Sequence, residues 1–153
     1  MLRNLFEHYL HDMSEWFDVD VNAHGSYSFD AASIWADGYD AYLAKDGESL
    51  VGFALVGPAT EWLPDEDAHD MHEFFVLRRF RRTGCGQKMA ELIWDQYPGN
   101  WLVRVLDANV TAVPFWRSTV SSQSGGSHTE ETRDVNGRPW RFFQFVSEPE
   151  AGE

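Results

Sequence analysis

The chain has 153 residues and a formal net charge of −13, from 25 acidic and 12 basic residues. This length suits about one domain with its own core, and a hydrophobic content of 43% is typical of a compact fold, not of a disordered chain. The acidic balance argues against general nucleic-acid binding, which needs a basic surface, and favours cationic partners such as amines.

Three further features narrow the class of protein. The single cysteine, Cys85, cannot form an internal disulfide. Residues 1–17 lack the apolar core and cleavage site of a signal peptide, and no segment approaches the roughly 18 apolar residues of a membrane helix. We therefore expect a cytoplasmic protein with no membrane partner, built as one domain over 1–147 with an acidic tail over 148–153.

Apolar residues spaced three and four apart predict a helix over residues 2–17, and a polar loop and a short helix at 31–39 follow. Residues 40–57 are typical of two strands joined at Asp46-Gly47. The other expected elements are a strand at 71–78, a helix at 85–97, a strand at 101–107, a short helix at 109–119 bent by Pro114, a flexible loop at 121–127, and a hairpin of 128–135 and 138–146 that turns at Asn136-Gly137. This order predicts a mixed, partly antiparallel sheet in an α/β (α+β) fold.

The segment FFVLRRFRRTGCGQ holds four of the twelve basic residues within five positions, directly before two glycines. A strand that runs into a glycine loop and then a helix offers unpaired N–H groups and a positive dipole end to an anion. Gly84 and Gly86 leave room for a phosphate to approach the backbone. The pattern indicates a diphosphate site, and a solvated arginine run before an ordinary glycine turn is the alternative. A P-loop is absent, and Met89 stands where a dinucleotide fingerprint needs a third glycine.

Arg81-Arg82-Thr83-Gly84-Cys85-Gly86 resembles the acyl-CoA signature of the GNAT acetyltransferase superfamily, Gln/Arg-x-x-Gly-x-Gly/Ala. Asn109, followed by a helix with Phe115-Trp116, resembles the next motif of that family. The resemblance implies a mostly antiparallel mixed sheet flanked by helices and splayed at an acetyl-CoA site. It also implies transfer of an acetyl group from acetyl-CoA to a primary amine of a small molecule or peptide. The residues implied in acetyl-CoA binding are Phe75, Val76, Leu77, Arg81, Arg82, Thr83, Gly84, Cys85, Gly86, Gln87 and Asn109.

Acetyl transfer to an amine needs a base that deprotonates the ammonium, and Glu73 is our candidate because the family often keeps a carboxylate near that position. Strand parity groups Glu73 with Met71 and Phe75, and it leaves open which face meets the substrate. A charged residue at a sheet edge is the plain structural alternative, and His72 is the alternative base.

Many members of the family have a tyrosine general acid as the second aromatic of the pair, where this chain has Trp116. The indole N–H of tryptophan is no useful acid. Tyr97 is expected to lie too far away, so no general acid is assigned.

The substrate pocket is assigned to Trp35 and Trp116. Further aromatic and acidic residues predict a cation pocket, with scattered surface acids beside core aromatics as the alternative; they are Trp16, Trp62, Asp18, Asp20, Asp37 and Asp40. No metal is expected, because His69, Asp70, His72 and Glu73 alternate between strand faces. Cys85 is interpreted as packing filler in preference to a nucleophile, although helix N-termini activate thiols.

Two other functions remain open at this stage. Trp116 is compatible with an acyl-CoA-binding regulatory or sensor module that has little catalysis. The aromatic strand RFFQFV is compatible with an RNA-binding sheet, but the charge of −13 argues against nucleic acid. A homodimer is also left open.

Overall fold

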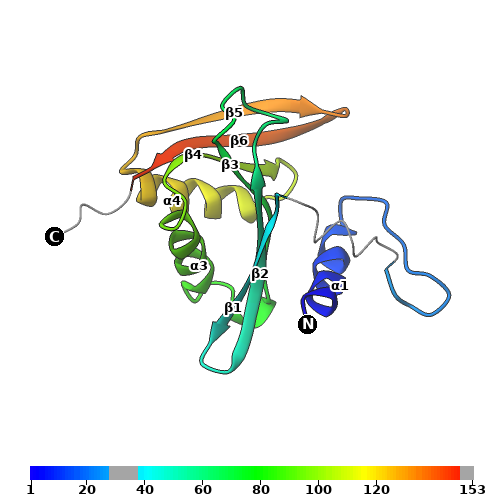
Figure 1. Ribbon diagram of the computed structural model, residues 1–153. Coiled ribbons are helices and arrows are strands. Elements are labelled where there is room, and N and C mark those ends of the chain that lie inside the picture. The colour runs from blue at the N-terminus through cyan, green and yellow to red at the C-terminus, as the bar shows by residue number, and fades with distance from the viewer. Residues whose placement is uncertain (28–37, 149–153) are drawn as a thin grey trace.

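The structure, a computed structural model, describes residues 1–27 and 38–148. Figure 1 shows one sheet with helices on both sides. The elements are α1 (Leu2–Met13), β1 (Asp40–Asp46), β2 (Ser49–Pro58), β3 (His69–Val76), the short 3-10 helix η1 (Arg78–Phe80), α3 (Cys85–Trp94), β4 (Gly99–Leu106), α4 (Ala112–Ser124), β5 (His128–Val135) and β6 (Arg138–Ser147). None of the described helices is long and apolar enough to span a bilayer.

The six strands form one sheet in the order β1-β2-β3-β4-β6-β5. Every neighbouring pair is antiparallel except β3 and β4, which are parallel. The mixed, mostly antiparallel sheet expected from the sequence is therefore confirmed. Both expected hairpins are present, and their turns use left-handed residues: Gly47 has φ 61°, Asn136 φ 54° and Gly137 φ 81°.

The two faces of the sheet carry different helices (Figure 1). On one face α3 and α4 cover a large core whose centre contains the fully buried Trp94, Trp101 and Phe143. On the other face α1 buries Leu2 and Leu5 against Phe53 and its neighbours on β2 and β3. The amphipathic spacing of each helix selects the stripe that it buries.

Helix ends are where the sequence analysis was least accurate. The first helix ends at Met13, four residues earlier than expected, and turns occupy the residues up to Trp16. The helix predicted at 109–119 begins at Ala112 and extends to Ser124, through the first half of the expected loop. Pro114 therefore lies in the first turn of α4, where the missing N–H of a proline breaks no helical hydrogen bond. The reason for expecting a bend at Pro114 is thereby removed. The short helix predicted at 31–39 lies mostly outside the described residues.

Candidate active site

The candidate site lies where the two parallel strands separate. β3 and β4 are paired only at His69–Trp101 and Asp70–Leu102, so their later residues have no partner strand between them. A cavity of about 440 Å³ fills this gap. Its lining comes from both sides of the sheet: Val103, Val105 and Trp116 belong to the α3–α4 core, and Phe6, Tyr9 and Trp16 come from the α1 side. The splay expected from the sequence therefore opens a passage through the sheet.

An irregularity at His72 decides which way Glu73 faces. Leu55 of β2 pairs with Glu73, but the next residue, Val56, pairs with Met71, so His72 is an extra residue on β3. Such a bulge reverses the alternation of side chains beyond it. Met71 consequently packs in the α3–α4 core, whereas Glu73 and Phe75 face α1. The prediction that Glu73 shares a face with Met71 is therefore wrong, and its grouping with Phe75 is right.

Glu73 lines the cavity and has one strong partner, the hydroxyl of Tyr9 on α1, which donates to Glu73 Oε2. Burial raises the pKa of Glu73, and the Tyr9 hydrogen bond and the nearby His72 counteract part of this rise. Burial, followed by the charge of Glu73, raises the pKa of Tyr9 well above its ordinary value, so Tyr9 stays a donor. The result is a carboxylate held in one position and made more basic than usual.

His72 lies between two carboxylates. Its Nδ1 is 3.5 Å from Asp70 Oδ2, and its Nε2 is 3.9 Å from Glu73 Oε1. The interaction with Asp70 raises the pKa of His72, against the opposing effect of burial. Arg104 of β4 holds Asp70 in a two-pronged contact, at 3.3 Å to Oδ1 and 2.7 Å to Oδ2. Because Asp70 is almost fully buried, this ion pair compensates a charge that water cannot reach.

The guanidinium of Arg104 also lies 4.7 Å from the centre of the Trp62 ring. Arg104 and Tyr9 are site residues that the sequence analysis missed. Arg104 is a charged residue inside a predicted apolar strand, and Tyr9 carries a hydroxyl group on the apolar face of a predicted helix. Each is a signal that could have identified it.

The arginine-glycine loop connects β3 to α3, as predicted, but its four arginines have different roles. Arg78 and Arg81 both bind the carboxylate of Asp12 on α1, at 2.9 and 2.5 Å, and Arg81 Nε also donates to Val76 O. Among the described residues no ion pair engages Arg79 or Arg82. Arg79 and Arg82 are therefore the arginines of the loop whose charge no described carboxylate neutralises.

The two loop glycines are needed for different reasons. Gly84 precedes α3 with φ 87°, a conformation that side chains disfavour, and a Cβ there would meet nothing within 4 Å. A Cβ on Gly86 would lie 3.2 Å from Phe115 and 3.4 Å from Val76. Lys88 N–H donates to Gly84 O at 3.0 Å, and Cys85 N–H donates to Thr83 Oγ1 at 3.4 Å. The N–H groups of Gly86 and Gln87, in the first turn of α3, are therefore the ones that can bind an external acceptor.

Other loop residues expected to bind the cofactor have local partners. Thr83 Oγ1 donates to Phe80 O, and Gln87 Nε2 donates to Glu91 at 2.9 Å. Leu77 N–H donates to Val51 O at 2.8 Å. Cys85 is half-buried and outside the lining of the cavity.

Asn109 and Trp116 line the cavity from the start of α4 and its second turn. Asn109 Oδ1 accepts from the N–H of Ala112, the first residue of α4, at 3.2 Å. Trp116 is 6% exposed and packs edge-on against Phe74, with ring centres 4.7 Å apart.

The predicted cation pocket is only partly assembled. Trp16 lines the cavity, but Asp18 and Asp20 are exposed beside it and Trp62 lies under Arg104. Asp40 accepts from Tyr97 at 2.7 Å. Tyr97 packs on His69 and Trp101, at the paired end of β3 and β4, which agrees with the expectation that it is too far away to act as the acid. Trp35 and Asp37 lie outside the described residues.

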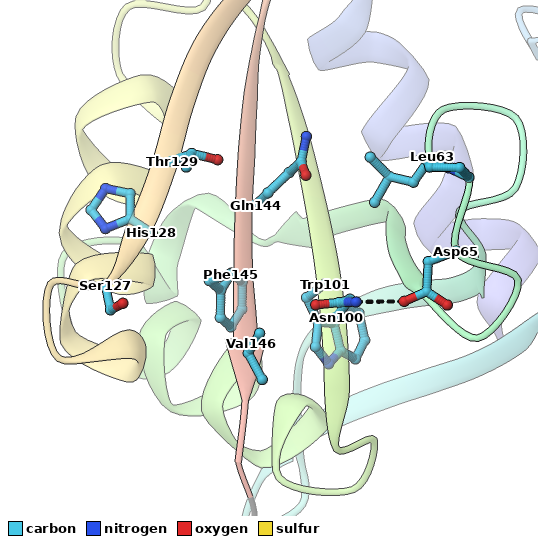
Figure 2. A pocket seen from close by; sticks show the side chains of 11 residues that line it. Leu63, Asp65, Asn100, Trp101, Ser127, His128, Thr129, Gln144, Phe145 and Val146 are labelled. Carbon is cyan, nitrogen blue, oxygen red and sulfur yellow. Dashed lines mark hydrogen bonds between the residues drawn. The ribbon is translucent and has the colours of Figure 1, made fainter.

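A second hollow of about 480 Å³ lies at the beginning of β4 and the end of β6, at the paired end of β3 and β4 (Figure 2). Asp65 and His128 are its only titratable side chains, and Asp65 accepts a hydrogen bond from Asn100, which lowers the pKa of that carboxyl. Neither Glu73 nor any residue of the arginine-glycine loop lines this hollow. We therefore take the splay cavity as the candidate site.

Comparison with known proteins agrees with this architecture. A family model described as the acetyltransferase (GNAT) family matches residues 4–119. None of the curated proteins matches. The yncA protein of Salmonella typhimurium, solved with its cofactor acetyl-CoA, is 13% identical with a TM-score of 0.61, over 99% of this chain and 91% of that one.

Two further solved structures have the same fold. A spermidine N-acetyltransferase from Vibrio cholerae is 12% identical with a TM-score of 0.59, over 91% of this chain and 88% of that one. The ribosomal-protein-S18-alanine N-acetyltransferase from Escherichia coli is 17% identical with a TM-score of 0.56, over 80% and 77%. At these identities the likeness establishes the fold alone.

Proposed function

This chain belongs to the acetyltransferase (GNAT) family, and we propose that it transfers the acetyl group of acetyl-CoA to the primary amine of a small molecule or peptide. The observation that carries this proposal is the passage through the splayed sheet, which has a glycine loop near one side and a half-buried carboxylate on the other. Neighbours of this fold that are named for acetylating spermidine or a ribosomal-protein alanine support an amine acceptor.

The residues around the loop fit acetyl-CoA. The free N–H groups at the start of α3 would bind the pyrophosphate together with Arg79 and Arg82, and the small Gly86 keeps the loop close to Phe115. The edge of β3 beyond Asp70, which has no strand partner on the β4 side, can pair with the pantetheine amides. When bound there, acetyl-CoA supplies an acetyl thioester with a good leaving group.

Glu73 is the proposed general base. Its raised pKa suits it to take the ammonium proton, so that the amine lone pair forms the N–C bond while the C–S bond breaks and its electron pair leaves on sulfur. Tyr9 would keep the carboxylate directed toward the cavity. His72 is the weaker candidate, because Asp70 favours its protonated form.

Trp116 is the proposed wall of the acyl pocket. It lines the cavity and is packed among Phe74, Trp94 and Phe115. No side chain is assigned as general acid, because a CoA thiolate can leave unassisted.

A panel of primary amines, assayed by thiol release from acetyl-CoA, tests the proposal. We expect amine-dependent thiol release together with acetylated product detected by mass spectrometry. Calorimetric binding of acetyl-CoA without release above background for any amine would favour the sensor module instead. Absence of acetyl-CoA binding would reject both functions.

A further inference from the structure

The α1 side of the cavity differs in character from the α3–α4 side. We define it as the acceptor chamber, because the loop and α4 supply the cofactor side of the passage. Its wall is apolar and half aromatic, and comprises Leu10, Met13, Trp16, Phe17, Leu106 and Trp140. The rings of Phe17 and Trp140 are 6.2 Å apart and inclined at 35°, so they present a joined aromatic surface. Leu106 pairs with Trp140 across β4 and β6, which continues the surface into the sheet.

The ionisable residues that line the inner end of the chamber are His72 and Glu73 on β3 and Arg104 on β4. Among the described residues that line the cavity, Glu73 is the only carboxylate. Arg104 forms an ion pair with the buried Asp70. Each charge neutralises the other, so Arg104 attracts an acidic acceptor only weakly and Asp70 is not available to bind the ammonium of an amine. A second cation, the guanidinium of Arg138, lies 5.0 Å from the Phe17 ring at the aromatic wall.

Within residues 1–27 and 38–148, the acidic residues near α1 other than Glu73 do not line the cavity. Asp12 binds Arg78 and Arg81, and the exposed Asp18 and Asp20 flank the lining residue Val19 without lining the cavity themselves. A bound polyamine would therefore bring its second ammonium beside two guanidiniums, with no carboxylate beyond Glu73 among the described lining residues, and contact with the aromatic rings offsets only part of this repulsion. Burial of a charge without a counter-charge is strongly unfavourable.

We propose that the acceptor is a monoamine in which a short linker joins the primary amine to an aromatic or similarly bulky apolar body. The amine lies at Glu73, and the apolar body packs on Trp16, Phe17 and Trp140. This inference rests on the proposed function, because it takes Glu73 to be the end of the chamber where the amine reacts. It goes further in excluding polyamines, which the net charge of −13 alone would have favoured.

The test compares phenethylamine, propylamine and spermidine as acceptors at saturating acetyl-CoA. Propylamine has a comparable ammonium without the ring, and spermidine adds charge without an apolar body. We expect kcat/KM for phenethylamine to exceed both by about 100-fold, since even one methylene in an apolar pocket is worth about 10–200-fold. Calorimetric titration of phenethylamine into the CoA complex measures binding apart from turnover.

Variants of the aromatic wall make the test specific. Trp140→Ala should raise KM for phenethylamine about 10-fold or more, and it should narrow the preference for phenethylamine over propylamine. Phe17→Leu is a second variant for the case in which Trp140→Ala fails to fold, as judged by its melting curve. Leu43→Ala, an exposed apolar residue on β1, is the matched control and should change nothing.

The outcomes separate this inference from the proposed function. Acetylation of spermidine as efficient as that of phenethylamine, or better, would overturn the monoamine assignment and leave the acetyltransferase function intact. Binding of phenethylamine that Trp140→Ala weakens, without thiol release from any amine, would support the chamber and overturn the acetyltransferase function. Absence of both phenethylamine binding and phenethylamine turnover would overturn the inference.

Discussion

Replacement of Glu73 by glutamine should reduce turnover strongly while acetyl-CoA affinity stays nearly constant. Glutamine has the same size and can still accept the hydrogen bond from Tyr9, so the substitution removes the basic charge with little change in shape. A general base contributes about 10²–10⁴-fold to rate, which corresponds to about 2.7–5.4 kcal/mol of barrier at 1.36 kcal/mol per tenfold. The loss should shrink at high pH, where solvent supplies free amine.

The same variant should be more stable than the parent at alkaline pH. Burial raises the folded-state pKa of Glu73 above the unfolded value, so its contribution to stability is complete below the unfolded pKa and is lost as pH rises through the folded pKa. Glutamine stays neutral and avoids this loss. The difference in Tm between Glu73→Gln and the parent should therefore increase from pH 4 to pH 8.

The assays are thiol release across pH 6–10, calorimetric titration with acetyl-CoA, and thermal melting at each pH. Glu48→Gln, an exposed glutamate in the β1–β2 turn, is the matched control and should leave all three measurements unchanged. A loss of turnover below tenfold and independent of pH would refute the role of Glu73 as base. An unchanged Tm difference across pH would refute its raised pKa.

Five further substitutions, at four positions, test the surrounding site. Tyr9→Phe removes a hydrogen bond that lowers the pKa of Glu73, so the acidic limb of the kcat/KM profile should move to higher pH; an unmoved limb would contradict the contact. Gly86→Val places branched atoms against Phe115 and should abolish CoA binding in calorimetry. Arg79→Ala should weaken the free energy of CoA binding by only about 1 kcal/mol, because it removes one screened charge contact. CoA binding by the valine variant that equals that of the parent would contradict the loop assignment. Trp116→Tyr and Trp116→Phe should both raise KM with similar kcat, and a tenfold higher kcat for tyrosine would reveal a vacant acid position.

Local features of the fold could be predicted because their causes are local. Asp46-Gly47 and Asn136-Gly137 supply the left-handed conformations that tight hairpins need, and both hairpins form. The helix after the glycine loop follows from its own apolar spacing, and it begins at the predicted Cys85. The helix expected from Asn109 begins three residues later, at Ala112, whose N–H donates to Asn109 Oδ1.

The amino-acid sequence by itself determined the order of strands and helices, the position of the glycine loop between β3 and α3, and the family. Only the tertiary structure decided how the site is assembled. One extra residue at His72 turns Glu73 toward α1, where Tyr9, 64 residues earlier in the chain, binds its carboxylate. Asp12 of α1 likewise forms ion pairs with Arg78 and Arg81, more than 60 residues later in the chain. Turns and caps depend on a few neighbouring residues, whereas the face of a bulged strand and the partner of a buried charge depend on packing between segments that are distant in sequence.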